Sequence, residues 1–370
     1  MSNGESSAAA IVERPVRVRP PLLTQLRLRF AAVSAQFFLG FLVAAFVAMI
    51  VAVWVQKGGT ETGEQMLNGL KQGAIYALIA VGYTMVYGII ELINFAHGDV
   101  FTLGAFLSVT IGAALGKLGL DVDSLATSNL GGLIAALVII FSLTMLATGM
   151  VGVVIERVAY RRLRNAPRLA PLITAIGMSF LLEGIMFVAY GSGNYQARKD
   201  GWITGTAFTV GNVQVFWPQL FVIVIAIVMM LGLQSFVRYT RLGKAMRATA
   251  QDRDAALLSG ININRTISAT FFIGSALAGA GAVVYAVYYN LLQWNLGFKF
   301  GIIAFTAAVL GGIGNILGAG LGGFLIGLIS VFGSELIGGQ WSNSIIFAML
   351  ITVLVLRPSG LLGMRVPDRA

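Results

Sequence analysis

Residues 66–104 read MLNGLKQGAIYALIAVGYTMVYGIIELINFAHGDVFTLG, and this stretch decides the fold class. Its apolar run over 66–90 is long enough to cross a bilayer, which takes about 20 mainly apolar residues. Four polar side chains follow within nine residues, at Glu91, Asn94, His97 and Asp99, before a second apolar run. Non-helical backbone at membrane depth is tolerated only where it is buried in protein or lines a cavity. The stretch therefore predicts two membrane helices separated by a polar break.

The composition of the whole chain also indicates a membrane protein. Of its 370 residues, 57% are hydrophobic and 11% are charged, whereas a soluble domain has about 25% charged residues. The mean hydropathy is +0.86. The absence of cysteine excludes disulfides, thiol nucleophiles and cysteine-bound metals. With one histidine and 15 acidic residues, the sequence predicts no catalytic residues, no metal site and no cofactor.

Ten apolar segments are candidates for membrane spans. They are roughly 30–55, 66–90, 98–117, 130–154, 170–190, 215–236, 266–290, 300–314, 318–338 and 342–357. Because glycine-rich breaks surround the short eighth segment, the division between 300 and 338 stays open. We therefore predict an all-α polytopic membrane protein with 8–10 transmembrane helices, including broken or re-entrant ones.

The positions of the 25 Lys and Arg residues predict the orientation. The net charge of +10 would suggest a nucleic-acid partner for a soluble protein, but cytoplasmic loops of membrane proteins carry an excess of Lys and Arg. With the N-terminus inside, 19 of the 25 lie in four cytoplasmic clusters, at 14–29, 157–168, 238–265 and 357–369. The other six lie outside or at the outer rim: Lys57, Lys71, Lys117, Arg198, Lys199 and Lys299. Both termini are therefore expected in the cytoplasm.

Two interpretations of the polar break remain open. Transporters use broken helices to direct helix ends at substrates, which makes Asn94, His97 and Asp99 candidates for a substrate pathway. Alternatively, the break is a cytoplasmic turn in which Asp99 caps the next helix and His97 is solvated. Glu183 lies inside the span 170–190, where an unpaired carboxylate costs about 2.5–3.5 kcal/mol. Glu183 either makes a structural polar contact or takes part in the substrate pathway.

Small residues predict close helix packing at two places. Gly69, Gly73 and Ala77 form a small-xxx-small ridge, which lets membrane helices approach closely. Residues 311–318 read GGIGNILG, but no strand precedes them and no Gly-Lys-Ser/Thr follows, so the sequence has no nucleotide-binding motif. Close packing and a helix break explain this segment, and Asn315 is a further candidate for the passage.

The loop over 238–265 is too long for a simple turn. It reads RYTRLGKAMRATAQDRDAALLSGININR, and 243–258 is compatible with one short helix that ends at Ser259 and Gly260. Such a helix at the membrane face would give another protein a surface to bind. A solvated loop whose charges only set topology explains the composition equally well.

Three further stretches complete a resemblance that begins with residues 68–106. They are IERVAYRRLRNAPRLAPLITAIGMS at 155–179, the loop 238–265, and FTAAVLGGIGNILGAGLGGFLIG at 305–327. Together they resemble the LivH-type permease subunit of bacterial branched-chain amino acid ABC importers over about residues 64–365. The resemblance implies a permease domain at 64–365 with a short C-terminal cytoplasmic tail, 366–370. A basic flexible tail, 1–29, and an extra span with its outer loop, 30–63, precede it.

The resemblance also assigns roles to residues. In this family a short cytoplasmic helix carries the power stroke from the ATPases into the membrane. The matching positions in the loop 238–265 are Gly243, Arg247, Ala248, Asp252, Ala255 and Gly260. The candidates for the substrate pathway remain Asn94, His97, Asp99, Glu183 and Asn315.

The function that the resemblance implies is ATP-driven import by alternating access across the bacterial inner membrane. The expected partners are two ATP-binding subunits, a second permease subunit and a periplasmic substrate-binding protein, with no nucleic acid. The substrate is a branched-chain or similar small amino acid, and a related solute such as urea or an amide is the alternative. An ion-coupled secondary transporter is less consistent with the sequence, because Glu183 is nearly alone as an intramembrane charge. The sequence does not support a membrane enzyme, because it contains no credible catalytic set of residues.

Overall fold

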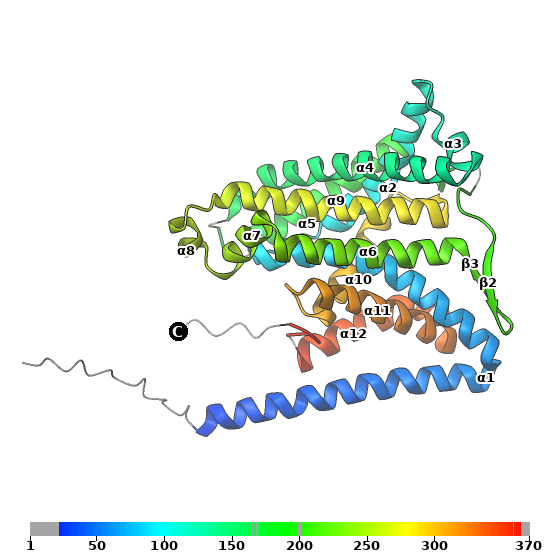
Figure 1. Ribbon diagram of the computed structural model, residues 1–370. Helices are drawn as coiled ribbons and strands as arrows, with labels where there is room; N and C mark the ends of the chain where they lie inside the picture. Colours follow the sequence, from blue (N-terminus) through cyan, green and yellow to red (C-terminus); the bar gives the residue numbers. More distant parts are fainter. Residues whose placement is uncertain (1–21, 165, 168, 199–200, 358, 364–370) are drawn as a thin grey trace, which may run out of the picture.

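The structure is a computed structural model that describes residues 22–164, 166–167, 169–198, 201–357 and 359–363, with side chains from Gly40 onward. Most of the predicted tail 1–29 and all of 366–370 lie outside these residues. The end of the predicted tail is helical, because the first helix begins at Leu22. The described residues form a bundle of helices with two small two-stranded sheets (Figure 1).

The α-helices of the described residues range from 6 to 69 residues in length. Their bounds are α1 Leu22–Ile90, α2 His97–Lys117, α3 Val122–Ser128, α4 Leu130–Ile155, α5 Leu169–Tyr190, α6 Trp217–Tyr239, α7 Arg241–Gln251, α8 Arg253–Leu258, α9 Ile263–Tyr289, α10 Leu296–Gly311, α11 Ile316–Ile337 and α12 Ser342–Leu356. A π-helical turn, Glu156–Tyr160, and a 3-10 turn, Arg161–Leu163, extend α4, and another 3-10 turn, Gly339–Trp341, precedes α12.

Eight helices of the described chain are long and apolar enough to cross a membrane, and α10 is a shorter apolar helix. One of the eight, Gly40–Ile90, has 51 residues and folds back on itself (Figure 1). The reversal is at Gly58, whose φ of 87° and ψ of 175° are not helical. We call residues 22–57 the first arm of α1 and 59–90 its second arm. The prediction of an all-α protein with 8–10 transmembrane helices is confirmed.

The four strands lie at the end of the bundle where α1 reverses. Strands β2, Thr206–Val210, and β3, Val213–Phe216, form an antiparallel hairpin. Strand β1, Tyr195–Gln196, pairs with β4, Leu291–Leu292, which joins the segment after α5 to the segment before α10. We call this the β2–β3 end, and the opposite end, with the short helices α7 and α8, the α7–α8 end (Figure 1).

The core consists of the second arm of α1 packed against α9, α10 and α11. The predicted small-residue ridge on α1 contacts glycines of α11. A Cβ on Gly323 would lie 2.8 Å from the Cβ of Ala77, and a Cβ on Gly73 would lie 2.7 Å from the Cα of Phe324. Small residues on both helices therefore let the two backbones approach as closely as the ridge predicts.

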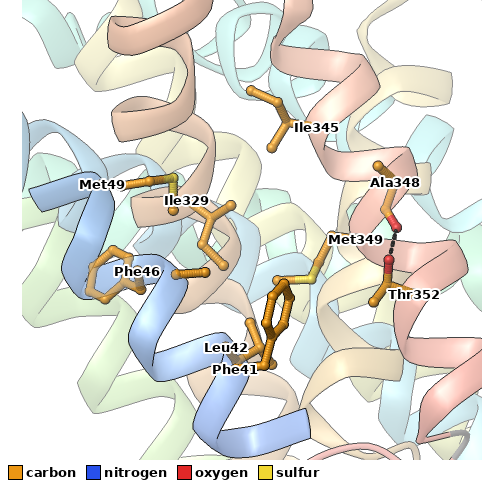
Figure 2. Close-up of a pocket in the computed structure, with 10 residues that line it drawn as sticks. Phe41, Leu42, Phe46, Met49, Ile329, Ile345, Ala348, Met349 and Thr352 are labelled. Carbon is orange, nitrogen blue, oxygen red and sulfur yellow. Dashed lines mark hydrogen bonds between the residues drawn. The ribbon is translucent and has the colours of Figure 1, made fainter. Parts of the chain in front are cut away.

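The first arm of α1 packs on the outside of this core, against α11 and α12. Phe46 makes an edge-to-face contact with Phe332, with ring centroids 6.0 Å apart, and Val53 is buried beside them. Lys57, next to the reversal, forms an ion pair with Glu335. Between the arm and the core lies an apolar crevice of about 190 Å³ (Figure 2), lined by Phe41, Leu42, Ala45, Phe46, Met49, Ile329, Ile345, Ala348, Met349 and Thr352.

Candidate functional site

The polar break lies inside the bundle and not at its end. Helix α1 ends at Ile90, Glu91 has a left-handed φ of 57°, and α2 begins at His97. A Cβ on Gly82 would lie 3.0 Å from His97 Nε2 and 2.7 Å from the carbonyl oxygen of Gly274. Since Gly274 is near the middle of α9, α2 begins near the middle of the bundle. His97 is buried, so the alternative of a solvated turn is wrong.

Several polar side chains are buried around the start of α2. Asn94 Oδ1 accepts a hydrogen bond from Tyr160 at 3.1 Å, and Asp99 Oδ2 accepts one from the Ser179 hydroxyl. The His97 ring meets the Tyr83 ring edge to face, with centroids 5.6 Å apart. Polar atoms without a hydrogen-bond partner are Asp99 Oδ1, both His97 nitrogens, Tyr83 Oη and Thr102 Oγ1. Unpaired buried polar atoms are rare and often mark function.

Two helix N-termini meet beside Asp99. A Cβ on Gly98 would collide with the carbonyl oxygen of Gly297, and a Cβ on Gly297 would collide with Asp99 Oδ1. Neither α2 nor α10 has a side-chain cap, and α12 lacks one as well, whereas side chains cap α3, α4, α7, α8, α9 and α11. Helix N-termini carry a partial positive charge that favours anions. Asp99 is in the first turn of α2 and next to the first turn of α10, so the partial positive charges of both N-termini act on its carboxylate.

Glu183 is near Asp99, whereas Asn315 lies away from both, at the helix break before α11. Glu183 lies one turn after Ser179 on α5, is half-buried, and is close enough to Asp99 for their charges to interact. Asn315 caps α11 by accepting from the Gly318 N–H at 3.0 Å, and it donates to the Leu362 carbonyl at 2.9 Å. The structure therefore groups Asp99 with Glu183, whereas Asn315 holds the helix break at Gly312. Sequence reasoning missed Ser179, which the four-residue spacing to Glu183 would have indicated.

The segment 238–265 contains two short helices, so the prediction of one helix over 243–258 is wrong. Helix α7 ends before Asp252, whose backbone is extended, with φ of −156°. The Asp252 carboxylate instead caps α8, accepting from the N–H groups of Asp254 at 2.9 Å and Ala255 at 3.1 Å. Aspartate favours the N-cap position over a helix interior because its side chain competes for backbone N–H groups.

The other predicted coupling residues have distinct surroundings. Gly243 is buried where a Cβ would collide with the Val237 carbonyl, and Arg247 donates to that same carbonyl. Ala248 is half-buried and Ala255 is exposed. Gly260 has a left-handed φ of 80° after the end of α8. Leu258 beside it is 90% exposed, so the tip of the segment presents an apolar side chain to the outside.

A buried ion network that sequence reasoning missed lies next to this segment. Glu156 is fully buried, pairs with Arg161 and Arg164, and accepts from the Ser268 hydroxyl at 2.8 Å. Burial lowers the pKa of the Arg164 guanidinium, and the charge of Glu156 opposes that shift. The sequence placed these arginines only in an orientation cluster. Spacings of five and eight residues are not those of helix neighbours, and Ser268 lies on another helix, so no local pattern indicates this network.

Arg253 links the coupling segment to the polar break. Its Nη2 donates to the carbonyl oxygen of Ile90, the last residue of α1, at 2.9 Å. Tyr160, from the turn that carries Glu156, donates to Asn94 in the same break. A small cavity of about 40 Å³ between them is lined by Ile90, Leu92, Tyr160, Arg164, Arg253, Ile267 and Phe271. The start of α8 and the break before α2 are therefore in direct contact.

Comparison with known proteins identifies the family. The family described as branched-chain amino acid transport system / permease component matches residues 65–354. The chain belongs to this permease family. The first arm of α1 precedes the matched region. No solved structure matches the chain.

Curated relatives agree with this assignment. The chain is 42% identical over 303 residues to the high-affinity branched-chain amino acid transport system permease protein BraD of Pseudomonas aeruginosa, covering 81% of this chain and 95% of the relative. It is 41% identical to the permease protein LivH of Escherichia coli, with the same coverage. The ribose import permease protein RbsC of Escherichia coli is 24% identical, over 84% of this chain and 91% of the relative. The chain is thus a multi-pass membrane permease, similar to transport subunits.

Proposed function

We propose that the protein is the permease subunit of an ATP-driven importer that moves branched-chain or similar small amino acids into the cytoplasm by alternating access. The observation that carries the proposal is the identity of 41–42% to the branched-chain amino acid permeases along 81% of the chain. Uptake of a related small solute, such as urea or an amide, is the alternative, because a permease for ribose is also a relative.

The proposed orientation places the α7–α8 end in the cytoplasm of a bacterial inner membrane, with both termini on the same side. The excess of Lys and Arg around 157–168 and 238–265 supports this orientation. The β2–β3 end then faces the periplasm, where a substrate-binding protein would deliver the solute. Two ATP-binding subunits and a second permease subunit would complete the assembly.

The proposed coupling surface is the exposed side of α7 and α8. The exposed side chains of Leu257 and Leu258 form a protruding apolar surface next to the charged residues of α7. A motion of this segment would reach the polar break through the bond from Arg253 to the Ile90 carbonyl. We propose that the break, with Asn94, His97 and Asp99, changes position when the ATPase subunits close.

Transport by the reconstituted assembly tests the proposal. Leucine uptake into proteoliposomes should require ATP, the ATPase subunits and the binding protein. Uptake that persists without ATP would overturn the ATP-driven mechanism and favour a secondary transporter. Uptake of urea or an amide in place of leucine would select the alternative substrate class.

Two substitutions test the coupling assignment separately. Arg247→Ala and Asp252→Ala should reduce uptake while leaving the amount of inserted protein unchanged, because they alter the surface and the cap of the coupling segment. Unchanged uptake in both variants would contradict the assignment and leave the transport function itself intact.

A further inference from the structure

Two matching stripes of side chains line the crevice between the first arm of α1 and the core. On the first arm they are Leu42, Ala45, Phe46 and Met49, and on α12 they are Ile345, Ala348, Met349 and Thr352. Both sets follow the spacing i, i+3, i+4, i+7, which places each set on one side of its helix. The first arm and α12 lie on opposite sides of the crevice (Figure 2). Each helix therefore directs its stripe toward the other across a space of about 190 Å³.

Protein side chains do not fill this space. The stripe of the first arm is half-buried, and Val53 is the only buried side chain among residues 40–57. On α12, Ala348 lines the crevice and is nevertheless exposed. Directly packed helices interdigitate their side chains, and packed interiors contain few voids larger than a water molecule. A second molecule is therefore expected between the two stripes.

The lining selects a hydrocarbon as that molecule. Nine of the ten lining residues are apolar. The tenth, Thr352, donates its hydroxyl to the Ala348 carbonyl oxygen at 2.7 Å within α12 (Figure 2), so the hydroxyl is already paired. A polar solute would lose its hydrogen bonds to water there without replacement. An acyl chain of a membrane lipid loses nothing, because lipid tails are as apolar as these side chains.

The crevice has acidic residues beyond its end near the reversal. There Lys57 forms its ion pair with Glu335, and Glu61 and Glu64 follow in the second arm. The positive charge of Lys57 is therefore already balanced. An anionic headgroup is not attracted to this end.

Positive charge lies at the other end of the crevice. The first two turns of the first arm carry Arg27 and Arg29. Since α11 reaches the β2–β3 end, α12 returns toward the α7–α8 end (Figure 1). Arg357 follows the end of α12, five residues and about 7.5 Å beyond Thr352. Basic groups between membrane helices attract the headgroups of anionic lipids.

We propose that an anionic phospholipid binds between the first arm and α12. One acyl chain lies between the two stripes, and the phosphate of the headgroup lies beside Arg357 and the basic first turns of the arm. The lipid joins the arm to the permease at the end opposite the Lys57–Glu335 pair. The site belongs to the arm that precedes the family match, and it does not depend on the proposed transport function.

Photolabelling of the full chain in phosphatidylcholine nanodiscs tests the proposal. Two probes with the same diazirine-bearing acyl chain are compared, one phosphatidylglycerol and one phosphatidylcholine, and labelled peptides are mapped by mass spectrometry. The phosphatidylglycerol probe should label 41–49 and 345–352 about tenfold more, the selectivity expected from two basic side chains near a headgroup. Both probes should label the surface of α4 around Val138 equally, because Val138 is exposed and lies away from the arm.

Substitutions separate the acyl chain from the headgroup. Ala45→Phe places a ring in the crevice and should lower phosphatidylglycerol labelling of 345–352 several-fold. Ala44→Phe is the matched control and should not, because Ala44 is exposed on the opposite side of the arm.

The headgroup contact is tested by removing the positive charge. Arg27→Gln, Arg29→Gln and Arg357→Gln together should reduce the labelling by phosphatidylglycerol to that by phosphatidylcholine. Arg157→Gln is the control and should leave the tenfold difference intact, because Arg157 follows α4 on the other side of the bundle (Figure 1).

Three results would overturn the proposal. Equal labelling of 41–49 and 345–352 by the two probes would show that no anionic headgroup is selected. Unchanged labelling in Ala45→Phe would show that only bulk lipid touches these helices. Loss of the labelling in the complete transport assembly would show that a partner subunit, and not a lipid, occupies the crevice.

Discussion

At the scale of single residues, the contact between Gly98 and Gly297 determines how closely α2 and α10 approach. A side chain on either glycine would collide with the other helix or with Asp99. The close approach is what places the Asp99 carboxylate against the start of α10. The glycine pair thus sets how closely Asp99 packs against the start of α10.

Gly98→Ala should lower the free energy of unfolding by about 1–3 kcal/mol, the usual effect of overpacking a filled core. The thermal unfolding midpoint of the purified protein in detergent measures it. Gly177→Ala on α5 is the control, because a Cβ there meets nothing within 4 Å and alanine favours helix over glycine. An unchanged midpoint for Gly98→Ala would contradict the packing described.

Glu156→Gln should also destabilise the protein, because it leaves two arginines without their counter-charge. Breaking a buried ion pair costs about 3–5 kcal/mol, but Arg161 is 37% exposed, so solvent screening reduces the expected loss to about 1–3 kcal/mol. Ser268→Ala removes the hydroxyl that donates to Glu156 and accepts from Arg161 but leaves the charges paired, so it should lose only about 1 kcal/mol. Equal midpoints for the two variants would contradict a dominant role of the charges.

At the scale of elements, the break before α2 connects the polar centre to the α7–α8 end. Arg253 contacts the last carbonyl of α1, and Glu91 next to it holds a left-handed backbone. Such a conformation in a residue other than glycine costs about 1–3 kcal/mol and persists only where its surroundings enforce it. A shift of α8 therefore acts on a segment that already stores strain.

Arg253→Ala should reduce ATP-dependent uptake by about tenfold while ATP hydrolysis by the assembly continues, because removing one charged hydrogen bond of about 1.5–3 kcal/mol breaks this link. The ratio of substrate moved to ATP hydrolysed measures the effect. Arg265→Ala, on the first turns of α9, is the control and should leave that ratio unchanged. Parallel loss of uptake and hydrolysis in Arg253→Ala would indicate failed assembly and not a broken link.

The sequence predicted elements better than it predicted contacts. Apolar length alone located the spans, and four polar residues within nine located the break, because both signals are local. The division of the coupling segment at Asp252 was missed, although its capping role is also local. The environment of Glu156 depends on helices more than a hundred residues apart, and no spacing within one segment encodes it. Ser179 was missed although its four-residue spacing to Glu183 on one helix is a local signal.

At the scale of the whole molecule, the chain combines a family permease with an added arm. The family match begins at residue 65, and the first arm of α1 packs outside the core through Phe46, Val53 and Lys57. The arm contacts α11 and α12 and does not contribute to the polar centre around Asp99. The relatives match over 95% of their own length, and the first arm lies outside the family match.

Deletion of residues 1–59 should therefore leave leucine uptake within about twofold of the full chain once the amounts of inserted protein are equalised. The apolar side chains that line the crevice would face lipid, in which apolar surface is readily accommodated. Uptake per inserted protein, compared with that of the full chain, is the measurement. Complete loss of uptake with normal insertion would show that the arm takes part in transport.

The reversal at Gly58 also has a topological consequence. The second arm of α1 starts at the β2–β3 end, whereas the first arm starts at the α7–α8 end and crosses the bundle once more (Figure 1). A reporter joined before Leu22 and one joined at residue 65 of an arm-less variant would occupy opposite compartments. The reversal at Gly58 thus determines the side of the membrane on which the sequence before the first arm lies.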